Sequence, residues 1–262
     1  MPDFPPEAAA VLRSLQDRVV AALPGRVEGL AVFGSLGEGD FFPPRSDLDL
    51  LCVLRDDLNA ADLERLREVH AALAAEFPAW DGRVEVNYLS RAALAAFGSS
   101  EPQMARISPG EPLHFTPATR HHTLTLAAAR SGVALVGPPP GELLPAIPPE
   151  EVRAVVRQHA AAWPAWVEDY DLPGGQAYAV LTLCRALFTV TTGGQASKKA
   201  AALWAAGRLP EWASLVWWAV NWWYGGGRDA PAESRAAEVR AFVAAASRLV
   251  LAAPEPPAGP GL

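Results

Sequence analysis

Apolar residues in the first half of the chain recur at two spacings, one typical of helices and one of strands. Over 6–23 they return every three or four positions, and Pro24-Gly25 then ends the run. Over 84–89, Val-Glu-Val-Asn-Tyr-Leu, apolar and polar residues alternate instead. These patterns predict helices over 6–23, 62–77, 91–97 and 119–131 and strands over 28–34, 47–54, 84–89 and 133–136.

The second half of the chain carries helical spacing only. A break at Gly137-Pro-Pro-Pro-Gly141 precedes it, and the segment 98–118, rich in Pro, Ser and Gly, reads as a crossover or linker. We therefore expect an α+β chain, with a mixed sheet and helices over 1–148, an all-α bundle over 149–253 and a disordered tail over 254–262. The bundle helices are predicted over 149–166, 176–193, 196–206, 210–223 and 231–252.

Two aspartates begin the predicted strand 47–54. Because side chains alternate along a strand, Asp47 and Asp49 point the same way while the leucines around them enter the core. Two carboxylates on one face of a buried strand repel each other and are costly to desolvate. A divalent cation relieves both costs, and magnesium is usually held by one or two carboxylates together with substrate phosphates. The pair predicts a magnesium site for nucleotidyl transfer.

A Gly-Ser turn follows the preceding strand. At Gly34-Ser35 the backbone N–H groups and the hydroxyl can approach a phosphate closely, since glycine has no side chain in the way. Alone, this dipeptide is ordinary turn chemistry, but the aspartates downstream favour a phosphate site. Ser46 is a candidate for placing a phosphate or for capping the loop.

A third acid lies in the strand 84–89. Glu85 stands between two valines, and such a residue can simply occupy the exposed face of a strand. If this strand lies beside the aspartate strand, Glu85 reaches the same place and can bind metal or act as general base for an attacking hydroxyl. Both interpretations stay open at this point.

The charge balance bears on the substrate. The 262 residues include 22 Lys and Arg against 29 Asp and Glu, a formal charge of −7. This argues against nucleic acid as the main substrate, which needs a basic surface, and suits a small cationic molecule better.

Two cysteines, Cys52 and Cys184, fall in apolar runs and are predicted to be buried core residues. The N-terminus lacks the pattern of a signal peptide, and no apolar run reaches membrane-spanning length. We expect a cytoplasmic monomer with no membrane partner.

Together, Gly34-Ser35, Ser46-Asp47-Leu48-Asp49 and Glu85 resemble the polymerase-beta-like nucleotidyltransferase superfamily. Segments of the second half are similar to the streptomycin/spectinomycin adenylyltransferases, and the resemblance covers about residues 25–250. It implies a polymerase-beta-like domain followed by a helical domain that closes over the nucleotide. The implied activity is transfer of AMP from ATP to a hydroxyl of an aminoglycoside. The supporting segments are Val133-Ala-Leu-Val-Gly-Pro138, Leu181-Thr-Leu-Cys-Arg185, Ala196-Ser-Lys-Lys199 and Ala205-Ala-Gly-Arg-Leu-Pro210.

The resemblance also assigns roles by position. Asp47 and Asp49 match magnesium ligands, and Glu85 matches the catalytic base. The substrate ATP and one or two Mg²⁺ ions are implied, with a small cationic antibiotic as acceptor. Nucleotide contacts are implied for Lys198, Arg185 and Tyr224, and contacts to the antibiotic for Trp166 and Asp171.

The chain departs from the family pattern on the acceptor side. A second acid expected near Gly175 is missing, the tryptophan expected around Glu111-Pro112 is absent, and His121-His122 replace acids. Two other functions therefore stay open: transfer of AMP to a different acceptor, such as a protein, and nucleotide binding without catalysis.

Overall fold

A computed structural model describes residues 4–255, which form two compact units that divide between Ile147 and Pro148. The predicted tail over 254–262 lies outside the described residues apart from Pro254 and Glu255. The Glu255 carboxylate pairs with Arg153 and Arg157.

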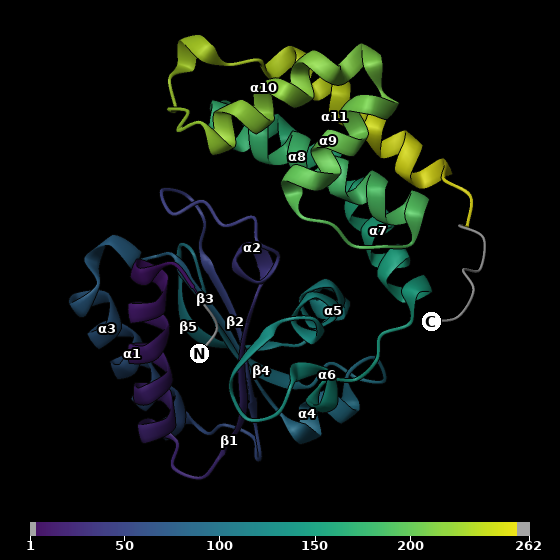
Figure 1. The fold of residues 1–262 in the computed structure, drawn as a ribbon. Coiled ribbons are helices and arrows are strands. Elements are labelled where there is room, and N and C mark those ends of the chain that lie inside the picture. Colours follow the sequence, from purple (N-terminus) through teal and green to yellow (C-terminus); the bar gives the residue numbers. More distant parts are fainter. Residues whose placement is uncertain (1–3, 256–262) are drawn as a thin grey trace. The chain divides into compact units, whose positions relative to one another are not determined.

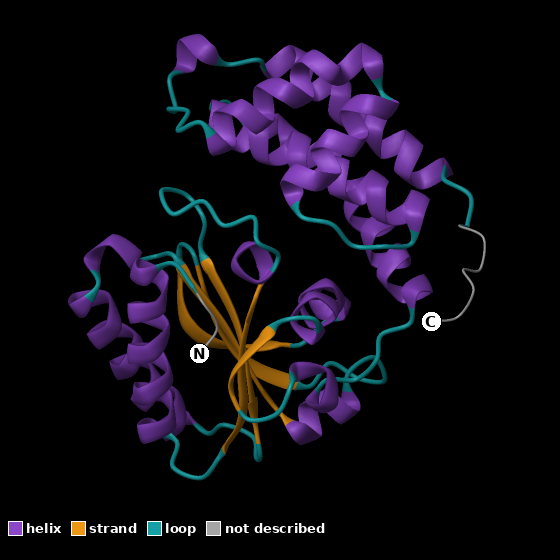
Figure 2. Cartoon of the chain, viewed as in Figure 1, coloured by secondary structure: helices purple, strands orange, loops and turns teal. Residues whose placement is uncertain are grey.

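The first unit is built on a mixed six-stranded sheet with the order β5-β4-β3-β2-β1-β6 (Figures 1 and 2). β2 and β3 run parallel and the other neighbours antiparallel, and α3 forms the crossover between the parallel pair. The strands are β1 (Val27–Phe33), β2 (Leu48–Leu54), β3 (Val84–Ser90), β4 (Gln103–Ser108), β5 (Glu111–Pro117) and β6 (Val133–Val136).

Helices cover both faces of this sheet (Figure 1). α1 and α3 pack on one face, where Leu12, Leu50 and Val86 belong to one core. α4, α5 and α6 lie on the other face, where Leu51 and Leu126 belong to a second core. The helices of this unit are α1 (Pro6–Ala22), α2 (Gly34–Gly37), α3 (Ala60–Glu76), α4 (Arg91–Ala96), α5 (Thr123–Arg130) and α6 (Pro140–Leu143).

The expectation of a crossover or linker over 98–118 is wrong. Residues 103–108 and 111–117 form β4 and β5, an antiparallel hairpin at one edge of the sheet. The Pro and Gly residues lie at the ends and the turn, where Gly110 adopts a φ of +82°, and an edge strand tolerates proline because one side of its backbone needs no partner.

Two boundaries near the aspartates also differ from the expectation. β2 begins at Leu48, so Asp47 lies just before the strand, and Gly34-Ser35 open the one-turn helix α2 instead of a simple turn. Asp47 and Asp49 nevertheless remain half-buried on either side of the fully buried Leu48.

The second unit is all-helical, as the periodicity predicts. α8 lies at its centre and packs against each of the other four long helices. None of the described helices is long and apolar enough to cross a membrane. The long helices are α7 (Pro149–Trp166), α8 (Pro173–Thr192), α9 (Lys198–Arg208), α10 (Ala213–Tyr224) and α11 (Ala236–Ala252).

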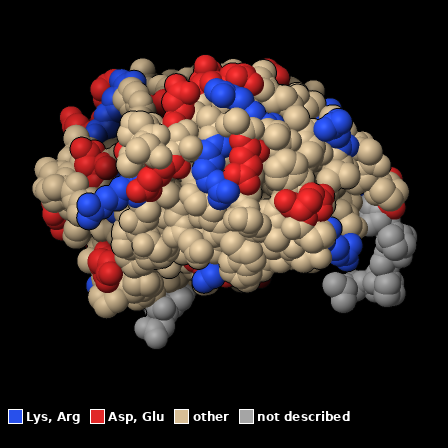
Figure 3. Space-filling model, turned by 90° about the horizontal axis from the view of Figure 1, so that it is seen from above, with Lys and Arg blue, Asp and Glu red and all other residues tan. Residues whose placement is uncertain are grey.

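On the face of the molecule drawn in Figure 3, acidic and basic side chains are interspersed, so no single sign of charge marks a binding surface there.

Candidate active site

The site is centred on Asp49, where β1 ends and β2 begins. Phe33, the last residue of β1, is the cross-strand partner of Asp49, so the following Gly34 turns directly over that carboxylate. Gly34 has a φ of +64°, and a Cβ built on it would lie 2.1 Å from Oδ2 of Asp49. This position requires glycine for its conformation and for its lack of a side chain. The hydroxyl of the adjacent Ser35 is buried and has no hydrogen-bond partner among the described residues.

A short loop leads into Asp47 and is held by hydrogen bonds at several points. The Ser46 hydroxyl is buried and accepts a hydrogen bond from the Phe42 N–H at 2.9 Å, which is a loop-capping contact. The Arg83 guanidinium donates to the Pro43 carbonyl at 2.6 Å and to the Ser46 carbonyl. Burial lowers the pKa of Arg83, while the negative charge of Asp47 raises it. These hydrogen bonds fix the backbone that leads into Asp47.

The same arginine is packed against aromatic rings. The Arg83 guanidinium lies 4.5 Å from the centroid of the Trp80 ring, and Trp80 stacks on Phe41 with centroids 6.2 Å apart. Phe41 belongs to the loop that precedes Asp47. The stack therefore joins the start of β3 to this loop through side chains as well as through hydrogen bonds.

Glu85 lies beside Asp49, because its strand is the neighbour of the aspartate strand. The two residues are directly paired in the parallel ladder between β2 and β3. Their neighbours Leu48, Leu50 and Val86 enter the core under α1 and α3, so both carboxylates point to the other face of the sheet. The carboxylates are then on one face and come from adjacent strands.

Glu85 has two polar neighbours that the sequence analysis missed. The Asn87 amide donates to Oε1 of Glu85 at 3.3 Å, and the Arg106 guanidinium contacts Oε2 at 3.4 Å. Alternation within 103–108 would have placed Arg106 on this face, but that segment was read as a linker. His122 is close enough for its pKa to respond to Arg106 and Glu85, although burial has the largest effect and lowers it.

The donor set at Asp47 and Asp49 fits a magnesium ion. Their hard carboxylate oxygens are half-buried on the same side of β2, and Gly34 leaves a space next to Asp49 that a Cβ would fill. Residues 4–255 hold no group of three His, Cys, Asp or Glu side chains arranged to bind a metal by themselves. Two aspartates with substrate phosphates are the usual arrangement for magnesium, and metal ligation by Asp47, Asp49 and Glu85 stays a prediction.

Among the predicted nucleotide-binding residues of the second unit, Lys198 and Tyr224 each take part in a cation–aromatic contact. Lys198 begins α9, and its ammonium lies 5.2 Å from the centroid of the Tyr178 ring and 4.9 Å from that of Trp223. Tyr178 and Arg185 are seven residues apart on α8 and share a helix face. The Lys199 ammonium lies 5.3 Å from the centroid of the Tyr224 ring.

The residues predicted to contact an antibiotic lie at the end of α7 and just beyond it. The Trp166 side chain is 43% exposed and meets Trp163 edge-to-face with centroids 5.6 Å apart. The Asp171 side chain is 85% exposed, with the Arg240 guanidinium at 4.0 Å. At Gly175, where the family pattern has an acid, a Cβ would lie 3.1 Å from the Tyr170 ring.

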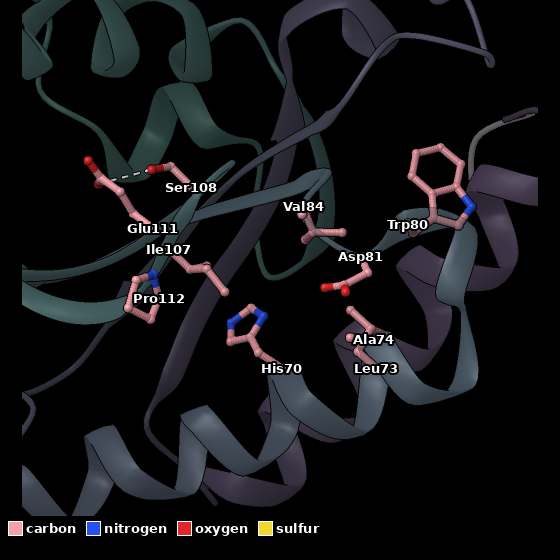
Figure 4. Close-up of a pocket in the computed structure, with 12 residues that line it drawn as sticks. His70, Leu73, Ala74, Trp80, Asp81, Val84, Ile107, Ser108, Glu111 and Pro112 are labelled. Atoms are coloured by element: carbon pink, nitrogen blue, oxygen red, sulfur yellow. Dashed lines mark hydrogen bonds between the residues drawn. The ribbon is translucent and has the colours of Figure 1, made fainter.

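A cavity of about 280 Å³ lies on the opposite face of the sheet, under α3 and the β4–β5 turn. Figure 4 shows His70 projecting from α3 into it, toward Ile107 and Val84. None of the predicted site residues lines this cavity. It is separate from the carboxylate site.

Comparison with known proteins gives two family matches. Residues 12–88 match the model of the nucleotidyltransferase domain, and residues 142–248 match the model of the aminoglycoside adenylyltransferase C-terminal domain. The first range includes every carboxylate of the site. The second includes the residues of the second unit predicted to bind nucleotide or antibiotic, namely Trp166, Asp171, Arg185, Lys198 and Tyr224.

One solved structure is similar over nearly its whole length. It is the crystal structure of spectinomycin adenyltransferase AAD(9) from Enterococcus faecialis with ATP and spectinomycin. The likeness has a TM-score of 0.75 at 20% sequence identity and covers 92% of this chain and 98% of that one. At this identity it establishes a shared fold. No curated protein sequence matches the chain.

Proposed function

Because the chain belongs to the aminoglycoside adenylyltransferase family, we propose that it transfers AMP from ATP to a hydroxyl of an aminoglycoside or aminocyclitol antibiotic. The observation that carries this proposal is the cross-strand pair of Asp49 and Glu85 beside Gly34. It supplies a metal-binding carboxylate and a base at adjacent positions. The solved relative was crystallised with ATP and spectinomycin, which supports ATP as the donor and a cationic antibiotic as the acceptor.

We assign metal binding to Asp47 and Asp49. When bound, Mg²⁺ offsets the negative charge that builds up on the phosphates during transfer. We assign the phosphate contacts to the Gly34 backbone and to the Ser35 hydroxyl. The hydroxyl is buried without a hydrogen-bond partner among the described residues, so it can donate a hydrogen bond to a phosphate oxygen. Ser46 fixes the loop before Asp47.

Glu85 acts as the general base in this proposal. Its carboxylate takes the proton of the acceptor hydroxyl, and the hydroxyl oxygen forms a bond to the α-phosphorus of ATP. The bond from that phosphorus to the bridging oxygen of the β-phosphate breaks, and pyrophosphate leaves with the electron pair. The antibiotic gains an O-adenylyl group and the proton rests on Glu85. Most of the rate enhancement comes from positioning and charge neutralisation.

Residues of the second unit bind the two substrates in this proposal. We assign Lys198 and Arg185 to the phosphates and Tyr224 to the nucleotide. The exposed Trp166 and Asp171 then serve the acceptor, the tryptophan as an apolar surface and the aspartate as a charge partner for a cationic ring system.

The test is pyrophosphate release by the purified protein with ATP, Mg²⁺ and a panel that includes streptomycin and spectinomycin. Release is expected only with an acceptor present, and Asp49→Asn and Glu85→Gln should each abolish most of it. Asp17→Asn, an exposed acid on α1, is the control and should leave the rate unchanged. Undiminished activity of the Asp49 and Glu85 variants would contradict the proposal.

A further inference from the structure

Three strands bring four polar side chains to one face of the sheet. Asp49 on β2 is paired with Glu85 on β3, and Asn87, two residues further, is paired with Arg106 on β4. Side chains two residues apart on a strand share a face, so Glu85 and Asn87 point the same way as their partners. The face that carries the carboxylates therefore continues into an amide and a guanidinium.

Both oxygens of the Glu85 carboxylate have a donor. Asn87 Nδ2 lies 3.3 Å from Oε1, and the Arg106 guanidinium lies 3.4 Å from Oε2. Glu85 is 17% exposed and Arg106 is 32% exposed, so the ion pair is largely shielded from water. Contacts at both oxygens restrict rotation of the carboxylate about its terminal bond. Long hydrogen bonds of this kind are common in active sites before substrate binds.

The arrangement costs the fold free energy. Asn87 is only 1% exposed, and its Oδ1 has no hydrogen-bond partner among the described residues. Nε of Arg106 is buried and likewise has no partner in that part of the chain. An unsatisfied buried acceptor or donor is destabilising, and an apolar residue of similar size avoids this cost. Stability therefore does not account for an amide at position 87, whereas orientation of Glu85 does.

We propose that Arg106 and Asn87 are positioning residues that hold the Glu85 carboxylate toward the acceptor hydroxyl. Neither touches the reacting atoms; each acts through Glu85, and the proposal rests on the catalytic role proposed for that residue. Arg106 contributes charge and one N–H donor, and Asn87 contributes one N–H donor. Loss of either leaves the base present but free to rotate, which lowers kcat more than it raises the KM for ATP.

The first experiment uses Arg106→Gln. We expect kcat to fall about 10- to 100-fold while the KM for ATP changes less than about twofold, as for a misoriented catalytic group. Arg106→Lys keeps a charge and a donor and should recover much of the rate. Arg18→Gln is the matched control, because Arg18 pairs with Glu76 at 2.7 Å and is 38% exposed but lies on α1, away from the site. It should leave kcat unchanged.

The second experiment asks whether Arg106 acts through Glu85. In single-turnover measurements, Arg106→Gln should cost little further rate when added to Glu85→Gln, because the residue that it positions is already lost. Full activity of Glu85→Gln alone would overturn the proposed function. An impaired Glu85→Gln that loses as much again on adding Arg106→Gln would overturn the positioning role and leave the proposed function intact.

Asn87→Leu provides a test that does not depend on Arg106. Leucine has the branched shape and the number of side-chain heavy atoms of asparagine and removes the unpartnered amide oxygen, so the thermal midpoint should stay the same or rise while kcat falls. A lower midpoint with unchanged kcat would mean that Asn87 serves the fold only, and would overturn its part in the proposal.

Discussion

A Cβ on Gly34 would lie 2.1 Å from Oδ2 of Asp49, closer than any side-chain carbon can come. Gly34→Ala must therefore displace the Asp49 carboxylate or the turn above it. We expect activity to fall at least about 100-fold, because small displacements at the reacting centre have effects of that size. The positive φ adds a stability cost of about 1 to 2 kcal/mol.

Gly25→Ala separates these two effects. Gly25 has a φ of +69° and open space around it, so alanine there pays the same conformational cost without any clash. Chemical unfolding should show a loss of stability in both variants, and a larger one in Gly34→Ala because of the added clash, whereas only Gly34→Ala should lose activity. Equal activity in the two variants would show that Gly34 is needed for its conformation alone.

Arg83 is expected to set the position of Asp47. Arg83→Met keeps an apolar stem over Trp80 but removes the hydrogen bonds to Pro43 and Ser46. Bonds from a charged donor predict a loss of about 2 kcal/mol in the free energy of unfolding. The loosened loop should also raise the magnesium concentration needed for half-maximal activity. Arg91→Met, which removes an exposed arginine near Glu28, should change neither quantity; equal magnesium dependence of both variants would contradict the prediction.

Acid should destabilise the first unit through His70. Burial lowers the pKa of His70 to about 4, from an ordinary value of 6.5, and its Nε2 lies 2.9 Å from the Tyr88 hydroxyl. Between these two values the unfolded chain binds the proton and the folded chain does not, so stability falls as the pH falls through this window. The difference corresponds to about 3 kcal/mol. Urea unfolding at pH 7 and pH 4.5 should reveal it, and His70→Gln should flatten the pH dependence.

Lys198 is predicted to differ in function from its neighbour Lys199. Both ammonium groups lie over aromatic rings, Lys198 over Tyr178 and Trp223 and Lys199 over Tyr224. If Lys198 contacts the triphosphate, Lys198→Ala should raise the KM for ATP about tenfold, the size of one charge-assisted contact. Lys198→Arg should stay close to the unsubstituted protein. A larger KM effect from Lys199→Ala would reverse the assignment.

Asp171 is expected to act on the acceptor only. Its side chain is 85% exposed, so Asp171→Asn should change the free energy of unfolding by less than about 0.5 kcal/mol. The KM for a cationic antibiotic should rise several-fold, since the charge partner is lost, and the KM for ATP should not change. Initial rates with both substrates varied would test this, and an unchanged antibiotic KM would remove Asp171 from the acceptor site.

Local patterns predicted those features that depend on nearby residues. Alternation around Leu48 placed Asp47 and Asp49 on one side of a buried strand, and helical spacing predicted α7 to the residue. The sequence analysis did not predict β4 and β5, because the prolines and glycines that are typical of a linker also occur at the ends of edge strands. Contacts of Glu85 with Asn87 and Arg106 depend on the order and register of three strands, which no local pattern contains.

The parallel register of β2 and β3 also decides which changes in chain length this protein can tolerate. Side-chain direction in a strand repeats every two residues, so inserting one residue in β3 before Glu85 would turn that carboxylate into the core beneath α3. Added residues in the mainly exposed loop 55–59, before α3, leave the ladder in register, and they cost only loop entropy. In divergent sequences, length should therefore vary within 55–59 far more readily than within α3 or at the two strands that it connects.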